Sequence, residues 1–272
     1  SLLIGFLSFL VFLNVGSPRA WPSGDTIPIK LQSISILEYG NLNLEGFRTG
    51  IPESRAYGFY RAGGQLLSAY PPGAALTALP IYGAFKALAP EAFDSWRYAY
   101  AVPNGDDLPN VANYMERFSS SLISALSVVV FWLICVRVTK DRTSSLWFTA
   151  AYALGTSLLS TASLALWQHG PACLFLGLTV LLLLKAEAQG RWSLVLAGLS
   201  AGWAYVCRPT VAVALAPLAL WVVWTFRWRA LGFLLASASM AAAVMIWNWV
   251  VYGSAVGGYS QVSAAFVPFT WT

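Results

Sequence analysis

The second half of the chain is built of apolar runs that are separated by short charged turns. Six runs carry no Asp, Glu, Lys or Arg, and they cover residues 118–136, 145–164, 171–184, 193–206, 210–225 and 230–251. A helix needs about 20 mostly apolar residues to cross the hydrocarbon core of a membrane. We therefore expect an all-α polytopic membrane protein with about seven transmembrane helices. Residues 1–15 supply the first of these, and because the chain opens at Ser1 within an apolar run, we expect a fragment or a trimmed chain.

The composition excludes several classes of protein. Of the 272 residues, 58% are apolar and only 10% are charged, whereas soluble domains carry about 25% charged residues. A soluble globule, a disordered region and a disulfide scaffold are therefore ruled out. The net charge of +5 does not indicate nucleic-acid binding, because most of the charges lie in short loops between apolar segments. The three cysteines, at 135, 173 and 207, have wide spacing that fits buried, inert thiols better than a zinc motif.

The positions of the basic residues predict which way the helices run. The turns 137–142, 185–191 and 226–229 together hold seven Lys or Arg and two acidic residues. Because Lys and Arg favour the cytoplasmic side in short loops, we place these turns inside. The helix ends at His169 and Arg208 then face outside.

Residues 16–116 differ in composition from the rest and contain most of the acidic residues. We expect one large external loop here, followed by six transmembrane helices over 117–252 and the start of another external loop over 253–272. The run 73–88 is apolar enough to be taken for a further span. The predicted sidedness, together with Pro71, Pro72 and Lys86, favours an interfacial or re-entrant helix instead.

Six polar residues near the expected external surface are candidates for function, because ionisable groups near a membrane core are costly. Asp25 lies just after the first apolar segment, where a carboxylate can act as a general base on a hydroxyl acceptor. A turn-forming Gly-Asp sequence is the simpler alternative. Lys30 lies five residues later and could bind a phosphate or be a solvated lysine. Tyr70 precedes Pro71 and would face a lipid headgroup.

The other candidates come from the apolar half. His169, the only histidine, lies in an expected external turn, where it could donate to a phosphate, ligate a metal with Cys173 or simply cap a helix. Arg208 breaks the inside-positive bias, so we expect it to bind an anionic group, although it could also extend towards lipid phosphate. Arg117 is a similar cation beside Glu116 and is better explained by a structural role.

These features together resemble the N-terminal module of the GT-C glycosyltransferases, in particular the bacterial family-39-like enzymes related to protein O-mannosyltransferases and to the aminoarabinose transferase of lipid A. The resemblance covers essentially the whole chain through short motifs in a shared order. The motifs are Ser23-Gly24-Asp25-Thr26, Tyr70-Pro71-Pro72-Gly73, the helix starting at Glu116-Arg117, Trp167-Gln168-His169-Gly170-Pro171, Cys207-Arg208-Pro209-Thr210, and the segment from Asn248 to Tyr259.

The resemblance implies a function and roles for these residues. A sugar would pass from a polyprenyl-phosphate donor to a lipid, glycan or protein acceptor, with inversion. The active site would face the outside of a bacterial inner (plasma) membrane. Asp25 would be the base, while Lys30, His169 and Arg208 would hold the departing phosphate and Tyr70 would flank the entry of the donor. No cofactor is firmly implied, and a divalent metal is left open.

Two other functions are compatible with some of these features. A transporter subunit or a lipid-binding protein could use the same cations for an anionic ligand, but the sequence has no repeated halves of the kind common in transporters. An intramembrane serine protease would need a serine and a histidine on facing helices, whereas His169 lies in an expected turn.

Overall fold

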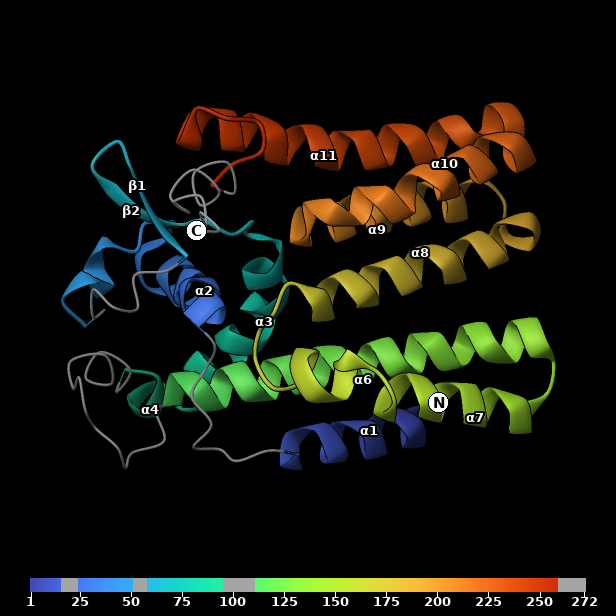
Figure 1. Ribbon diagram of the computed structural model, residues 1–272, viewed down its shortest axis with the longest axis horizontal. Helices are drawn as coiled ribbons and strands as arrows, with labels where there is room; N and C mark the ends of the chain where they lie inside the picture. The colour runs from blue at the N-terminus through green and yellow to red at the C-terminus, as the bar shows by residue number, and fades with distance from the viewer. Residues whose placement is uncertain (16–23, 51–57, 95–110, 259–272) are drawn as a thin grey trace, which may run out of the picture. The chain divides into compact units, whose positions relative to one another are not determined.

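The computed structural model describes residues 1–15, 24–50, 58–94 and 111–258 (Figure 1). This part of the chain contains ten α-helices and one two-stranded antiparallel sheet, so the all-α class is confirmed. The helices are α1 (Leu2–Asn14), α2 (Ile27–Tyr39), α3 (Gly73–Leu88), α4 (Pro90–Asp94), α6 (Val111–Thr139), α7 (Arg142–Leu154), α8 (His169–Gln189), α9 (Arg191–Cys207), α10 (Ala212–Phe226) and α11 (Ala230–Tyr252). The strands are β1 (Phe59–Ala62) and β2 (Gln65–Ser68).

The chain divides into two compact units. The first contains residues 1–17 and 117–242, and the second contains residues 18–116 and 243–272. The domain limits expected from the sequence remain a prediction, and each unit is described below by itself.

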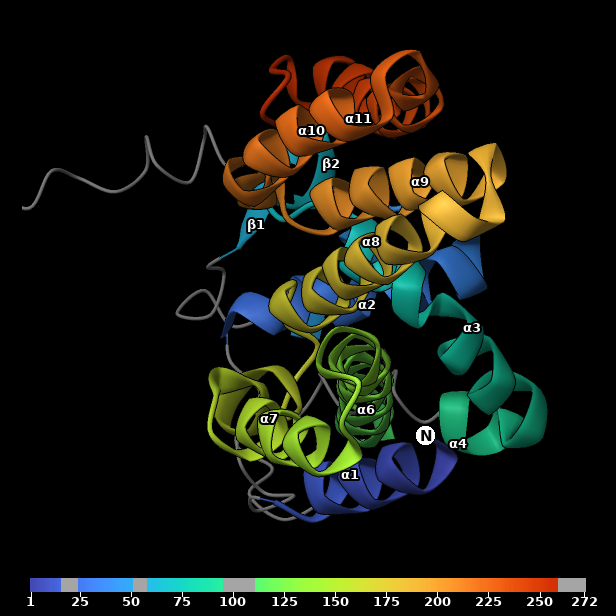
Figure 2. The same cartoon turned by 90° about the vertical axis from the view of Figure 1, so that its right-hand side faces the viewer.

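The first unit has two apolar clusters in its core. In one, Phe12 of α1 packs with Ala125 and Val128 of α6, with Ala153 of α7 and with a π-helical turn at Leu158–Ala162. These three helices lie side by side in both views (Figures 1 and 2). The second cluster joins α8, α9, α10 and α11, and its members are Leu183, Ala186, Leu194, Ala197, Ala201, Val222, Phe226, Ala230 and Phe233.

Two glycines allow α9 and α11 to approach each other closely. A Cβ on Gly198 would lie 2.9 Å from the carbonyl carbon of Phe233, and one on Gly202 would lie 3.0 Å from the carbonyl oxygen of Ser237. The two glycines are four residues apart and so share one face of α9. Small residues at this spacing are what lets membrane helices pack backbone against backbone.

The second unit is built around α2, whose residues from Ile27 to Ser35 are all buried. The helix has Pro28 in its first turn and ends at Gly40, which adopts a left-handed conformation with φ of +66°. The hairpin packs against it, and its two-residue turn is Gly63-Gly64, both with positive φ. A pair of residues with positive φ is what a tight hairpin turn requires.

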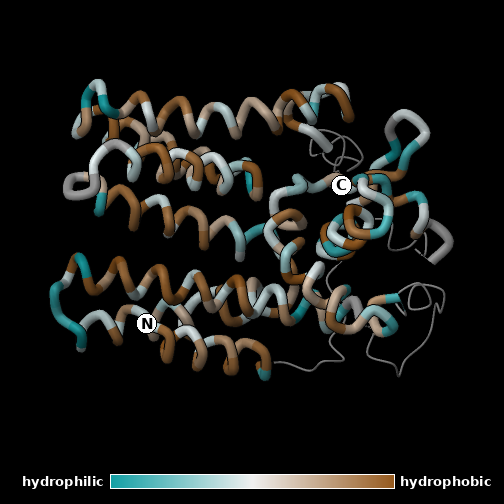
Figure 3. The backbone as a smooth tube through the Cα atoms, turned by 180° about the vertical axis from the view of Figure 1, so that it is seen from behind, coloured by the Kyte–Doolittle hydropathy of each residue, from teal (hydrophilic) through white to brown (hydrophobic). Residues whose placement is uncertain are grey.

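Three helical stretches of the described chain are long and apolar enough to cross a membrane: Asn113–Thr139, His169–Ala186 and Pro209–Tyr252. The last contains both α10 and α11, joined by a 3-10 turn at Arg227–Arg229. Figure 3 shows apolar residues along the helices and hydrophilic residues at the turns that join them. An integral membrane protein is therefore supported, but the prediction of seven spanning helices is wrong.

The difference arises because an uncharged run need not be one continuous helix. The run 145–164 contains Gly155, and α7 ends at Leu154 after 13 residues. At 1.5 Å per residue this helix is about 20 Å long, shorter than the hydrocarbon core of about 30 Å. The helices α1 and α9 have 13 and 17 residues. The run 73–88 is the helix α3, of 16 residues, and whether it lies at an interface stays a prediction.

Candidate functional site

The Asp25 carboxylate and the Tyr70 phenol form a hydrogen bond in the second unit. The hydroxyl of Tyr70 donates to Oδ1 of Asp25 over 2.7 Å. Asp25 lies in the 3-10 turn Gly24–Thr26 that leads into α2, and Tyr70 follows strand β2. Asp25 is half-buried. Within the described residues, its carboxylate accepts this one hydrogen bond, from Tyr70. One carboxylate oxygen is thereby oriented, and the other remains to accept a proton or a hydrogen bond.

The position of the Tyr70 ring depends on Gly58. Gly58 has φ of +82°, and a Cβ there would lie 2.7 Å from Cε2 of Tyr70 and 3.2 Å from Cγ of Pro28. Its carbonyl accepts a 2.7 Å hydrogen bond from the backbone N–H of Ala69, next to Tyr70. Glycine at position 58 thus adopts a positive φ without the strain that a side chain would add, and it leaves space for the Tyr70 ring. The sequence placed Tyr70 towards a lipid headgroup, whereas the side chain is only 9% exposed.

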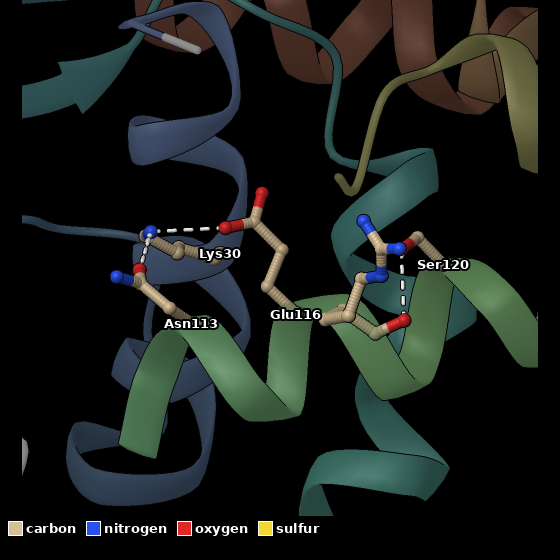
Figure 4. A network of polar contacts seen from close by, with 5 residues as sticks. Lys30, Asn113, Glu116 and Ser120 are labelled. Carbon is tan, nitrogen blue, oxygen red and sulfur yellow. Dashed lines mark hydrogen bonds and ion pairs between the residues drawn. The ribbon is translucent and has the colours of Figure 1, made fainter. Parts of the chain in front are cut away.

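Lys30 is fully buried in the same unit. Its Nζ lies 2.9 Å from Oε2 of Glu116 and 2.6 Å from Oδ1 of Asn113. Figure 4 shows the lysine reaching from α2 between these two side chains of α6. Glu116 is only 2% exposed. In this conformation the ammonium group neutralises a carboxylate, so its expected role in phosphate binding has no support here and stays a prediction.

Arg117 holds the end of a helix in the first unit. Its Nη2 donates to the carbonyl oxygen of Phe12 over 2.9 Å, and Phe12 lies in the last turn of α1. Arginine side chains commonly satisfy the last carbonyls of helices, which have no intrahelical partner. This contact fits the structural role that the sequence favoured for Arg117.

His169 and Arg208 form a second polar pair, in the first unit. Nη1 of Arg208 lies 3.0 Å from Nε2 of His169, and its Nε donates to Oγ1 of Thr210 over 2.8 Å. Because a guanidinium only donates, Nε2 of the imidazole must be the acceptor in this contact. The sequence predicted that His169 lies in a turn, whereas the structure makes it the first residue of α8. Both side chains are partly exposed.

The described residues offer no metal site of the usual composition. In residues 1–15, 24–50, 58–94 and 111–258, no group of three or more His, Cys, Asp or Glu lies close enough to hold an ion. Cys135 and Cys207 are buried as expected, whereas Cys173 is exposed, so the expectation of three buried thiols is wrong for that residue.

Sequence reasoning found members of both polar pairs but not the pairings. Asp25 and Tyr70 are 45 residues apart, and His169 and Arg208 are 39 apart. It missed Asn113 and Glu116 as partners of Lys30, although their spacing of three residues places them on one face of a helix. It also missed Thr210, which directly follows the Arg208-Pro209 motif.

Comparison with known proteins adds no relative. No protein-family model, no curated protein and no solved structure matches the chain. The function is therefore argued from the polar groups described above.

Proposed function

We propose that the chain is a membrane glycosyltransferase of the GT-C type, acting on a polyprenyl-phosphate-linked sugar with Asp25 as the base. The observation that supports this most is the 2.7 Å hydrogen bond from Tyr70 to Asp25. It joins the acidic motif and the Pro-Pro motif, which were identified separately in the sequence. A half-buried carboxylate with one oriented oxygen is suited to accept a proton from a bound hydroxyl.

The reaction follows from this role. The free oxygen of Asp25 takes the proton of the acceptor hydroxyl while the acceptor oxygen attacks the anomeric carbon of the sugar. The bond between that carbon and the phosphate oxygen breaks, and polyprenyl phosphate leaves with the electron pair. Attack opposite to the leaving group inverts the anomeric centre. Asp25 later returns its proton to water.

Arg208 is proposed to bind the phosphate of the donor. Its contacts with His169 and Thr210 hold the guanidinium and leave N–H groups for an anion, since a guanidinium has five. A planar guanidinium group can bind a phosphate through two parallel N–H···O hydrogen bonds. Lys30 and Arg117 have no such role in this proposal, because Lys30 is paired with Glu116 and Arg117 binds the end of α1.

The location of the protein is part of the same proposal. The long apolar helices support a membrane protein, and the basic turns 137–142, 185–191 and 226–229 favour the cytoplasmic side. The transfer would then occur on the external side of a bacterial inner membrane, where polyprenyl-phosphate sugars serve as donors.

The test compares Asp25→Asn with the wild-type chain in membranes. The probes are undecaprenyl phosphate carrying radiolabelled mannose, glucose or arabinose, and the measurement is the release of the labelled sugar from the lipid donor. We expect release from one donor by the wild type and a loss of at least 100-fold in Asp25→Asn, as for removal of a general base. Asp94→Asn, at an exposed position of α4, is the matched control and should match the wild type. Equal release by wild-type and Asp25→Asn membranes contradicts the proposal.

A further inference from the structure

The end of α11 is hydrogen-bonded to the segment that carries Tyr70. The hydroxyl of Tyr252 donates to the carbonyl oxygen of Ser68 over 2.6 Å, across 184 residues of sequence. Tyr252 is 7% exposed, Ser68 is fully buried and Ala69 is 2% exposed. A hydrogen bond between groups so well shielded from water is stronger than one at the surface.

This contact continues to the carboxylate through two further hydrogen bonds. The backbone N–H of Tyr70 donates to Oγ of Ser68 over 3.1 Å, and the hydroxyl of Tyr70 donates to Oδ1 of Asp25. Ser68 thus receives one hydrogen bond from Tyr252 and one from Tyr70. A displacement of Ser68 would move the backbone from which the Tyr70 ring projects.

The Tyr252 ring is itself fixed between two aromatic side chains. Its centroid is 5.4 Å from that of Trp247, in an edge-to-face arrangement, and 5.8 Å from that of Tyr60. Such pairs contribute to stability beyond the area they bury. The phenol therefore has one well-defined direction, and its hydroxyl reaches Ser68 from a rigid base.

The turn after α11 contacts the same segment. A Cβ on Gly258 would lie 2.6 Å from Cα of Ala69, so only a glycine permits this approach. The turn is held by Asn248, whose Nδ2 donates to the carbonyl oxygen of Ala255 over 3.1 Å. Residues 252–258 therefore support the segment Ser68, Ala69 and Tyr70 at two successive positions.

We infer that Tyr252 is a positioning residue for Asp25, acting through Ser68 and Tyr70. This inference rests on the proposed function, because it assigns Tyr252 a part in the same transfer reaction. Catalytic groups must be held to within about 0.5 Å of their productive geometry, and residues behind them provide that precision. Tyr252 contacts no reacting atom and affects the carboxylate only through the two residues between them.

The test uses Tyr252→Phe, which removes one hydroxyl and keeps the ring. Tyr60→Phe is the matched control, since the hydroxyl of Tyr60 makes no hydrogen bond within the described part of the chain. With the donor identified above, we expect kcat to fall about five- to tenfold in Tyr252→Phe, the effect of one hydrogen bond, with KM unchanged. Because Tyr252 acts through Tyr70, its substitution should have no further effect in the Tyr70→Phe background.

A second measurement does not depend on activity. Hydrogen exchange at the amides of Ala69 and Tyr70, followed by mass spectrometry, should be at least about fivefold faster in Tyr252→Phe and unchanged in Tyr60→Phe. Additive effects of Tyr252→Phe and Tyr70→Phe on kcat, or unchanged exchange, overturn the inference. If the wild type transfers no sugar, the proposed function fails, and the exchange result still decides whether Tyr252 positions this segment.

Discussion

The Lys30 ammonium and the Glu116 carboxylate lie 2.9 Å apart, with exposed fractions of 0% and 2%. Taking both charges out of water is costly, so the pair is expected to be sensitive to the loss of either member. The pair joins α2 to the first turns of α6, although Lys30 and Glu116 are 86 residues apart in the sequence. It therefore fixes the helix that follows Asp25.

The first prediction concerns this ion pair. Lys30→Met leaves the buried carboxylate without its cation and should lower the free energy of unfolding by about 3–5 kcal/mol. The double variant Lys30→Met/Glu116→Leu removes both charges and should recover most of that loss. The measurement is the midpoint of thermal unfolding in detergent. A double variant no more stable than Lys30→Met contradicts the interpretation.

The second prediction concerns the close packing of α9 and α11. Gly198→Ala places a methyl group against the backbone of Phe233, which cannot move as a flexible side chain can. It should lower stability by about 1–3 kcal/mol. Gly83→Ala in α3 is the control, because its Cβ would meet only Cδ2 of Leu37, at 3.9 Å. Alanine is favoured over glycine within a helix, so this change should be neutral or stabilising. The same thermal midpoint distinguishes the two, and equal effects would contradict the prediction.

The third prediction concerns Asp141, which caps the start of α7. Its carboxylate accepts hydrogen bonds from the backbone N–H groups of Ser144 and Thr143. The side chain of Ser144 contributes most to holding the pKa of Asp141 below its usual value, and the two backbone N–H groups lower that pKa further. A lowered pKa in the folded state means that the stabilisation is present above the unfolded pKa of about 3.9. It is lost as the pH falls through the folded pKa.

The pH dependence of the thermal midpoint tests this cap. The wild type should lose stability relative to Asp141→Asn as the pH falls below about 4, because asparagine caps a helix but does not titrate. The control is Asp94→Asn, which should follow the wild-type curve. A constant difference between wild type and Asp141→Asn over this pH range would rule out a contribution from the cap.

The sequence predicted the apolar helices better than their ends. The run 118–136 lies within α6, but the helix extends back to Val111, and its first turns carry Asn113 and the buried Glu116 as partners of Lys30. The hairpin was not predicted, although Gly63-Gly64 between two short runs is a known signal for one. A window of uncharged residues also does not detect a break such as Gly155, which is why seven spans were predicted.

The candidate site could be predicted only as separate residues. The sequence indicates Asp25 and Tyr70 individually, because an acid or a Pro-Pro motif is recognisable in it. Their hydrogen bond depends on the fold of the second unit, including the positive φ of Gly58. The sequence alone favours phosphate binding by Lys30, because no local signal reveals that a lysine will be buried beside a glutamate 86 residues away.

The last prediction concerns Arg208, whose guanidinium is held by His169 and Thr210. Arg208→Lys keeps the positive charge but removes the planar guanidinium. A lysine ammonium cannot form two parallel hydrogen bonds with a phosphate while also keeping the contacts with His169 and Thr210. We expect kcat/KM for the polyprenyl-phosphate donor to fall about tenfold, which corresponds to about 1.4 kcal/mol, mainly through a higher KM. Arg142→Lys, at an exposed position at the start of α7, is the matched control and should match the wild type. His169→Gln retains a side-chain acceptor for Arg208 and should be less harmful than His169→Leu. An unchanged KM in Arg208→Lys would mean that this arginine does not bind the donor phosphate.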